Sequence, residues 1–349
     1  MDTTRFTATL LRTSASGFAA MAVSRALERS GGKDGLEGDF DAWQSHFQNL
    51  VLELAAALED GSQQQFAAKV RWGCEAFGAR GPQPLMLRDG LGELGAVLRD
   101  SLPSDSWGSL AGFLEAATLE LDRSPSPADT VVGGDSPFGE LVDSYLALVW
   151  EGDARRAIDL VADAIRGKQL SVSDALDGVL TLALQKIGLG WHEGTINIAE
   201  EHFATQTTSR LLEQILFLAP EPSPNGHSVI LTMAEGDAHD LGLRIVSAFF
   251  ELDGWRSISL GANTPSNDLA QAAERFDADL IVIGATLNTH RVGVAQALKV
   301  LKQVRPAQKV LIGGPAFRAL GEAAAEIGAD GCALDARDAL RLGRALLGL

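Results

Sequence analysis

Apolar residues follow a helical period through most of the chain. Up to about residue 218 they recur every three or four positions, as at Ile158, Val161 and Ile165, and strand-like runs are nearly absent. That spacing places the apolar side chains on one face of a helix. In the middle of the chain it predicts four helices, at about 138–151, 154–166, 172–190 and 197–217. Connectors this short favour an antiparallel four-helix bundle.

The pattern changes towards the C-terminus. Short β-rich runs beginning at Val229, Ser257, Leu280 and Val310 alternate with helical segments, and a weaker run follows at 331–334. Strands separated by helices are typical of βαβ units, which form a parallel sheet with helices on both faces. This part of the chain is therefore expected to be a flavodoxin-like, doubly wound α/β domain of Rossmann-like type. Ligands of such sheets bind beyond the carboxyl ends of the strands.

Two stretches rich in Pro, Ser, Gly and Asn interrupt these patterns, at residues 123–134 and 219–226. Such compositions are typical of linkers. The expected architecture is thus all-α followed by α/β, in three domains. They are a helical N-terminal domain at 1–124, a four-helix bundle at 135–218 and the α/β domain at 227–349.

Composition and charge exclude several classes of function. Lysine and arginine total 29 against 46 acidic residues, a formal net charge of −17. So acidic a chain is poorly suited to bind nucleic acid directly, and no apolar run approaches the roughly 18 residues of a membrane-spanning helix. Two cysteines, Cys74 and Cys332, are too few for a disulfide framework or a cysteine-based zinc site. With no secretory signal at its start, the chain is expected to be cytoplasmic.

The most informative chemistry follows the first predicted strand. The segment reads Asp237-x-His239-x-x-Gly242 and lacks the glycine motif of dinucleotide-binding domains. A carboxylate two residues from an imidazole is suited to orient that imidazole as a metal ligand. Because one histidine cannot build a tight protein-only metal site, the natural ligand is a metal already held in an organic ring. The alternative is a helix-capping aspartate beside a surface histidine.

Together with three other turns, this motif resembles the cobalamin-binding domain over residues 227–349. The turns follow successive strands and contain Gly261-Ala-Asn-Thr-Pro, Gly284-Ala-Thr286-Leu and Gly313-Gly314-Pro. By this resemblance His239 is the lower ligand of cobalt and Asp237 is hydrogen-bonded to it. The other cofactor-binding residues there would be Gly242, Gly261, Thr286, Gly313 and Gly314. The family often has Ser-x-Leu after its third strand, so here Thr286 or Asn288 would supply any hydroxyl or amide.

A second polar cluster joins the last two helices of the predicted bundle. Trp191 and His192 directly follow Gly190, and nine residues separate Trp191 from the pair Glu201-His202. A bundle needs only apolar residues at such a turn, so this composition indicates a binding surface. The alternative is that Trp191 closes the end of the bundle and both histidines are solvated.

In front of a cobalamin-binding domain, W-x(9)-E-H resembles the CarH-type photoreceptors, over residues 137–349. The resemblance implies adenosylcobalamin as cofactor, with Trp191 packed on the adenosyl group and Glu201 and His202 at its polar edge. It further implies that light breaks the cobalt–carbon bond and that His192 is the candidate upper cobalt ligand after light. Some similar photoreceptors also carry a bilin, so biliverdin or another bilin is conceivable as a second chromophore.

The N-terminal block departs from that family, whose usual members carry a basic DNA-binding helix-turn-helix. Residues 1–135 are acidic and contain no compact basic recognition helix. We therefore expect a sensor that is not an enzyme and that forms a homo-oligomer. Its signal is expected to pass to an unidentified signalling protein. The alternatives are a corrinoid methyl carrier of a methyltransferase system and a light-independent cobalamin-sensing adaptor. A mutase is disfavoured because the N-terminal pattern offers no substrate barrel.

Overall fold

The computed structural model describes residues 3–29, 40–78, 84–122, 136–318 and 327–349, so the linker predicted at 123–134 lies outside the described residues. The chain divides into two compact units. The first comprises Met1–Thr130 together with Gly190–Ile196, and the second comprises Val131–Leu189 and Asn197–Leu349. None of the described helices is long and apolar enough to cross a membrane.

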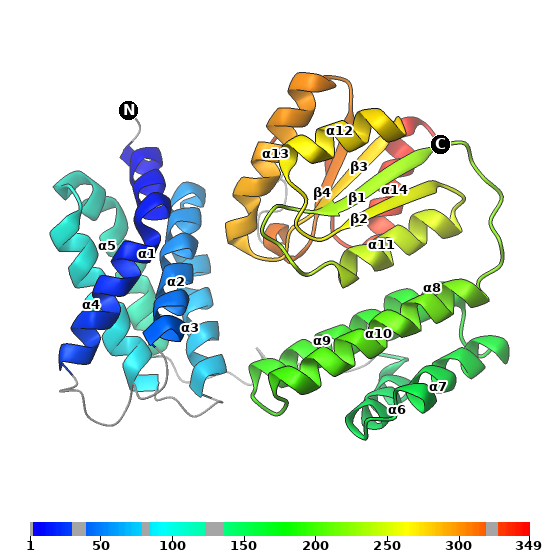
Figure 1. Cartoon of the computed structure of the whole chain (residues 1–349), viewed down its shortest axis with the longest axis horizontal. Coiled ribbons are helices and arrows are strands. Elements are labelled where there is room, and N and C mark those ends of the chain that lie inside the picture. The colour runs from blue at the N-terminus through cyan, green and yellow to red at the C-terminus, as the bar shows by residue number, and fades with distance from the viewer. Residues whose placement is uncertain (1–2, 30–39, 79–83, 123–135, 319–326) are drawn as a thin grey trace. The chain divides into compact units, whose positions relative to one another are not determined.

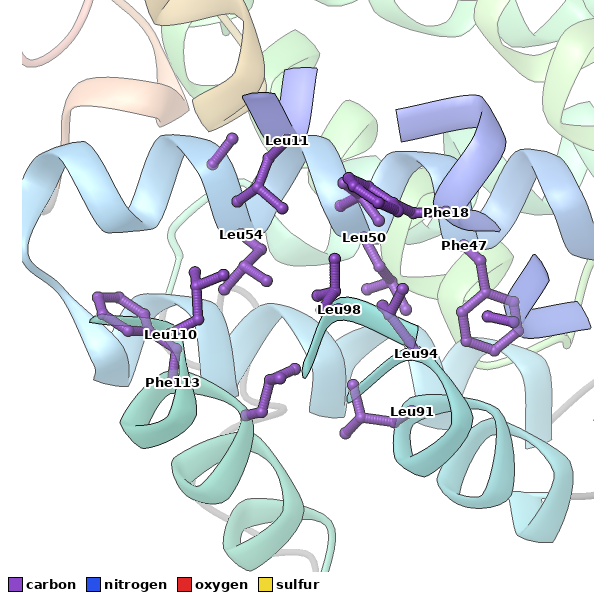
Figure 2. Packing of buried hydrophobic residues seen from close by; sticks show 14 of the residues in the cluster. Leu11, Phe18, Phe47, Leu50, Leu54, Leu91, Leu94, Leu98, Leu110 and Phe113 are labelled. Atoms are coloured by element: carbon purple, nitrogen blue, oxygen red, sulfur yellow. The ribbon is translucent and has the colours of Figure 1, made fainter. Parts of the chain in front are cut away.

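The first unit is built from helices, as the pattern predicts. They are α1 (Thr3–Arg29), α2 (Phe40–Asp60), α3 (Gln63–Gly78), α4 (Pro84–Ser101) and α5 (Ser104–Leu121). On α1 the buried residues Leu11, Ala15, Phe18 and Ala22 recur at helical spacing and form one apolar stripe. Figure 2 shows the shared core, in which Leu11 and Phe18 lie among leucines of the neighbouring helices.

The second unit begins with the predicted bundle. Its elements are α6 (Gly139–Trp150), α7 (Ala154–Arg166), α8 (Val172–Asp174), a π-helical turn η2 (Ala175–Leu180), α9 (Thr181–His192) and α10 (Ile198–Leu218). The third predicted helix is therefore interrupted by a π-turn. Tyr145 and Thr208 share a buried hydrogen bond of 3.0 Å between α6 and α10. Residues 219–226 form the predicted extended connection to the sheet.

The rest of the second unit is a five-stranded parallel sheet. Its strands are β1 (Ser228–Met233), β2 (Arg256–Gly261), β3 (Leu280–Gly284), β4 (Lys309–Gly313) and β5 (Gly331–Ala333), in the order β2-β1-β3-β4-β5. The covering helices are α11 (Leu241–Leu252), α12 (Ser266–Phe276), α13 (Arg291–Val304) and α14 (Ala336–Leu347) (Figure 1). This order confirms the flavodoxin-like expectation.

Alternate strand residues supply the two faces of the sheet. Ile230 and Ile281 pack with the residues of α12 and α13, whereas Leu231 and Val282 pack with those of α11 and α14. β1 and β3 are buried along their whole length, which explains why they read as continuous apolar runs rather than alternating ones.

Two arginines of the α/β domain bind the bundle. Arg244 of α11 donates to the Ser209 hydroxyl at 2.7 Å and also contacts Glu213, both on α10. Arg337 of α14 donates to Asp177 of the π-turn at 2.8 Å. Polar and charged contacts therefore join α11 and α14 of the α/β domain to the bundle.

Candidate functional site

Glycine-containing turns lie at the carboxyl ends of β1, β2 and β4. Gly236, Gly261 and Gly314 have φ values of +87°, +79° and +102°, a region that side chains other than glycine adopt only with strain. At Gly314 an added Cβ would lie 2.4 Å from the Ala285 carbonyl oxygen. The turn after β4 therefore approaches the turn after β3 too closely for a side chain.

Asp237 lies in the turn after β1 and its side chain is fully buried. Its Oδ1 accepts hydrogen bonds from the His239 ring nitrogen Nδ1 at 2.8 Å and from the His239 backbone N–H at 3.1 Å. Its Oδ2 accepts one from the backbone N–H of Thr286 at 2.6 Å, in the turn after β3. The structure thus joins Asp237, His239 and Thr286, with Thr286 contributing its backbone to Asp237.

The sequence did not reveal that a second histidine shares this aspartate. His290 ends the short 3-10 turn η3 (Asn288–His290), and its Nδ1 lies 3.0 Å from the Asp237 Oδ2. The side chain of His290 is 14% exposed, whereas that of His239 is 64% exposed. The signal that could have found it is the adjacency of β1 and β3, which brings the turns at their carboxyl ends together.

These contacts keep the Asp237 carboxyl ionised. Burial pushes its pKa upwards, but hydrogen bonds from His239, from His290 and from the backbone at His239 and Thr286 outweigh burial and hold the pKa well below its usual range. An ionised carboxylate only accepts hydrogen bonds. The Nδ1 of His239 therefore carries a proton and donates a hydrogen bond to Asp237. The Nε2 of His239 is then the nitrogen with the lone pair suited to a metal.

This donor set fits a metal that is already held in an organic ring. His239 offers a single imidazole, which the hydrogen bond to the Asp237 carboxylate orients. Among the residues that the structure describes, no three His, Cys, Asp or Glu side chains converge as a metal site. The glycine turns at this edge of the sheet provide bare backbone, which a large planar or extended ligand can approach closely.

The remaining predicted glycines lie at the same edge of the sheet. Gly242 is the second residue of α11, and a Cβ added there would meet no atom within 4 Å. Gly313 ends β4, and a Cβ there would lie 3.1 Å from the Ala333 carbonyl oxygen. The fold itself therefore requires a glycine at 314, and favours one at 313, but makes no such demand at 242.

Trp191 and His192 end α9 and are grouped with the first unit. The Trp72 ring of α3 stacks on both, with centroid separations of 6.1 Å to Trp191 and 4.8 Å to His192. The His192 Nε2 lies 3.5 Å from a Glu75 carboxylate oxygen, and its Nδ1 is buried with no hydrogen-bond partner among the described residues. Trp72 is thus a neighbour of this pair that the sequence did not indicate.

Glu201 and His202 lie in the first turn of α10. Asn197 caps this helix, accepting from the backbone at Ala199 and Glu200 while Glu200 accepts from the Asn197 backbone N–H. Glu201 accepts from the Thr205 hydroxyl at 2.7 Å and lies 3.6 Å from the His202 Nε2. The His202 side chain is 72% exposed. The assignment of these two residues to a cap over cobalt stays a prediction.

Two family models match the chain, both described as a B12 binding domain. One covers residues 227–342 and the other covers 141–216. A dimethylamine corrinoid protein of Methanosarcina acetivorans is 30% identical over 175 residues, which are 48% of this chain and 79% of that protein. The chain belongs to the family of corrinoid proteins. It is a cobalamin-binding protein, as the residues around His239 predict.

Other similar proteins show how far the likeness extends. A corrinoid protein of Desulfitobacterium hafniense is 28% identical over 60% of this chain and 98% of its own length. The transcriptional repressor CarA of Myxococcus xanthus is 29% identical over 33% of this chain and 38% of its own length. The monomethylamine corrinoid protein of Methanosarcina barkeri has the same fold over 61% of this chain, with a TM-score of 0.52 at 21% identity. Helices α1 to α5 precede both family matches.

Proposed function

We propose that this corrinoid protein is a light sensor that binds adenosylcobalamin. In this proposal His239 is the lower ligand of cobalt, and Trp191 with Glu201 and His202 encloses the adenosyl group. The cofactor would supply the photochemistry, since light breaks its cobalt–carbon bond. The protein residues would hold the adenosyl group in darkness and respond to its loss.

The observation that carries the proposal is the composition of the α9–α10 turn. An indole, two imidazoles and a carboxylate around one turn suit a large ligand with polar edges. A methyl group needs only a small apolar lid. Loss of a bulky group would also leave a cavity, which a close-packed bundle must refill or relax around.

The contacts of the His192 side chain support a role in which this residue exchanges one bonding partner for another after light. Leaving a buried polar nitrogen without a hydrogen bond costs about 1–3 kcal/mol, and the Nδ1 of His192 is such an atom among the described residues. A side chain kept at that cost is suited to exchange its contacts. His192 is therefore our candidate for the upper cobalt ligand after light.

The output is proposed to be a contact with another protein or with a second copy of the chain. Helices α1 to α5 lie outside the matched B12-binding regions, and Trp72 of α3 contacts the Trp191–His192 pair. A change at His192 would thus reach α3 directly. The proposed sensor is not an enzyme, and the acidic N-terminal block does not suit operator binding.

The test compares adenosylcobalamin with methylcobalamin in darkness, on the native chain and on Trp191→Ala. We expect the native chain to prefer adenosylcobalamin and the variant to lose that preference. Trp150→Ala is the matched control, since Trp150 is an exposed tryptophan on α6 of the same bundle. Equal affinity of the native chain for both forms would refute the cap and favour a methyl carrier.

The methyl-carrier alternative has its own support, because several similar proteins are named dimethylamine corrinoid proteins. A light-independent cobalamin sensor would use the same binding residues as the proposed light sensor. It would differ from the light sensor in having the same structure in darkness and in light. A bilin as second chromophore is tested by solvent extraction of the purified protein. A linear tetrapyrrole in the extract would support it.

A further inference from the structure

The buried carboxylate of Asp237 divides its two oxygens between two histidines. Oδ1 accepts from His239, through both the ring and the backbone. Oδ2 accepts from the Thr286 backbone N–H at 2.6 Å and lies 3.0 Å from the His290 Nδ1. The carboxylate is therefore held at both ends by groups from two different turns.

The geometry decides the form of His290. Its Nδ1 is 3.0 Å from the Asp237 carboxylate and 3.4 Å from the backbone nitrogen of Leu287. These two contacts require opposite roles, since the carboxylate needs a donor and the Leu287 N–H needs an acceptor. The shorter contact, to a charged acceptor, is the stronger one. The His290 Nδ1 therefore carries its proton and donates to Asp237.

Without that donor, the Asp237 Oδ2 would keep the Thr286 N–H as its one hydrogen-bond donor among the described residues. A buried carboxylate with an unmet oxygen is costly, so the group would rotate to share its remaining donors or admit water. Either change moves the acceptor that the His239 Nδ1–H points at. The orientation and protonation pattern of His239 thus depend on His290 through the shared carboxylate of Asp237.

We propose that His290 is a positioning residue for the lower cobalt ligand, acting through Asp237 to fix the ring of His239 with its Nε2 towards the cofactor. This proposal rests on His239 as the lower ligand and is independent of light sensing. Changes in the groups that orient a metal-binding histidine typically lower metal affinity by about 10- to 100-fold. Since His290 acts one contact further out, we expect the lower end of that range.

The test uses two substitutions in the full-length chain. His290→Phe keeps a ring of similar size and removes the donor, whereas His290→Asn places an amide N–H near the position of Nδ1. We expect His290→Phe to weaken cobalamin binding about tenfold and His290→Asn to retain most of the affinity. His227→Phe is the control, because His227 is another partly exposed ring beside a carboxylate, preceding β1 at the opposite end of the strand.

A second readout needs no cofactor. Nitrogen NMR of the imidazoles in the cobalamin-free protein reports which ring nitrogen carries the proton. In the native chain we expect His239 and His290 both to carry a proton at Nδ1. In His290→Phe we expect His239 to become a mixture of forms protonated at Nδ1 and at Nε2. A native His290 protonated at Nε2 would overturn the proposal, even if a variant failed to fold.

Two binding results would also overturn it. One is an unchanged affinity and His239 tautomer in His290→Phe. The other is an equal loss in His290→Asn and His290→Phe, which would mean that ring shape matters and the donated hydrogen bond does not. Failure of the lower-ligand assignment is distinguishable, because His239→Ala would then leave the cobalt–nitrogen coupling in the electron paramagnetic resonance spectrum of bound cobalt(II) cobalamin unchanged.

Discussion

Substitutions at Gly314 and Gly242 can distinguish a glycine that the fold requires from a glycine that ligand binding requires. Both lie at the carboxyl edge of the sheet, and both belong to the motifs that resemble the cobalamin-binding domain. Gly314 has a φ of +102° and no room for a Cβ, whereas Gly242 has no neighbour within 4 Å of that position. Substituting alanine at each is therefore a matched pair of perturbations.

The cost of Gly314→Ala follows from its surroundings. Holding a residue with a Cβ at such a φ costs about 1–3 kcal/mol. The new Cβ would lie 2.4 Å from the Ala285 carbonyl oxygen, which accepts from the Ala316 N–H at 3.2 Å. Displacing that carbonyl weakens a hydrogen bond worth about 1 kcal/mol. We expect the α/β domain to lose about 2–4 kcal/mol.

Hydrogen exchange with mass spectrometry measures this loss locally in the full-length chain. Peptides from β3 and β4 should exchange faster by about 30-fold to several hundredfold, if they open with the whole domain. Gly242→Ala should leave exchange unchanged or slow it, because alanine in a helix is favoured over glycine by up to about 1 kcal/mol.

Gly242→Ala should weaken cobalamin binding even though it does not destabilise the protein. If the cofactor lies over this position, an extra methyl group in the contact costs about 1–3 kcal/mol, which is about 5- to 150-fold in affinity. Gly242→Ala should therefore be a stable protein that binds cobalamin poorly. Normal binding by Gly242→Ala would refute this placement, and unchanged exchange in Gly314→Ala would refute the steric argument.

Three further predictions concern groups elsewhere in the second unit. Tyr145, the single tyrosine of the chain, has its pKa raised to about 12 by burial, although its hydrogen bond with Thr208 lowers it; phenolate absorbance should stay absent at pH 10–11 and appear only near pH 12 or on unfolding. Because the pKa of Asp237 is lowered in the folded state, its contribution to stability is complete above its unfolded pKa of about 4 and is lost as the pH falls below that value. The difference in unfolding free energy between the native and Asp237→Asn proteins should therefore shrink as the pH falls below about 4. Arg337→Ala removes a half-exposed ion pair with Asp177 and should cost no more than about 1 kcal/mol, with faster exchange confined to 175–180 and α14; a large global loss would contradict this.

Local pattern was sufficient to predict most elements of the fold. The helix at 154–166 coincides with α7, and the β-rich runs coincide with the strands, because periodicity is set by which side chains face a core. The π-turn at Ala175–Leu180 escaped prediction. There Gly178 approaches the Phe138 ring so closely that a Cβ would lie 2.3 Å from it, and such tertiary fits leave no periodic signal.

The site was predictable to the extent that its residues are close in sequence. Asp237 and His239 are two positions apart, so their contact could be inferred from the motif alone. His290 reaches the same carboxylate only because β3 lies beside β1. Trp72 likewise meets His192 through tertiary packing, although the segment around Trp72 offers no sequence feature that indicates such a role. The assignment of Trp191, Glu201 and His202 to a cap, and the three domain boundaries, stay predictions.

The most direct test of the light-sensing account measures structure and spectrum on one sample. The full-length chain is loaded with adenosylcobalamin in darkness, and absorption and hydrogen exchange are recorded before and after green light. Free adenosylcobalamin also loses its adenosyl group in light, so the decisive signal is in the protein. The account predicts that light changes exchange at 190–196 and in α3, and that the lit cobalamin differs in spectrum from free hydroxocobalamin. Identical exchange before and after light, with complete photolysis, would contradict it.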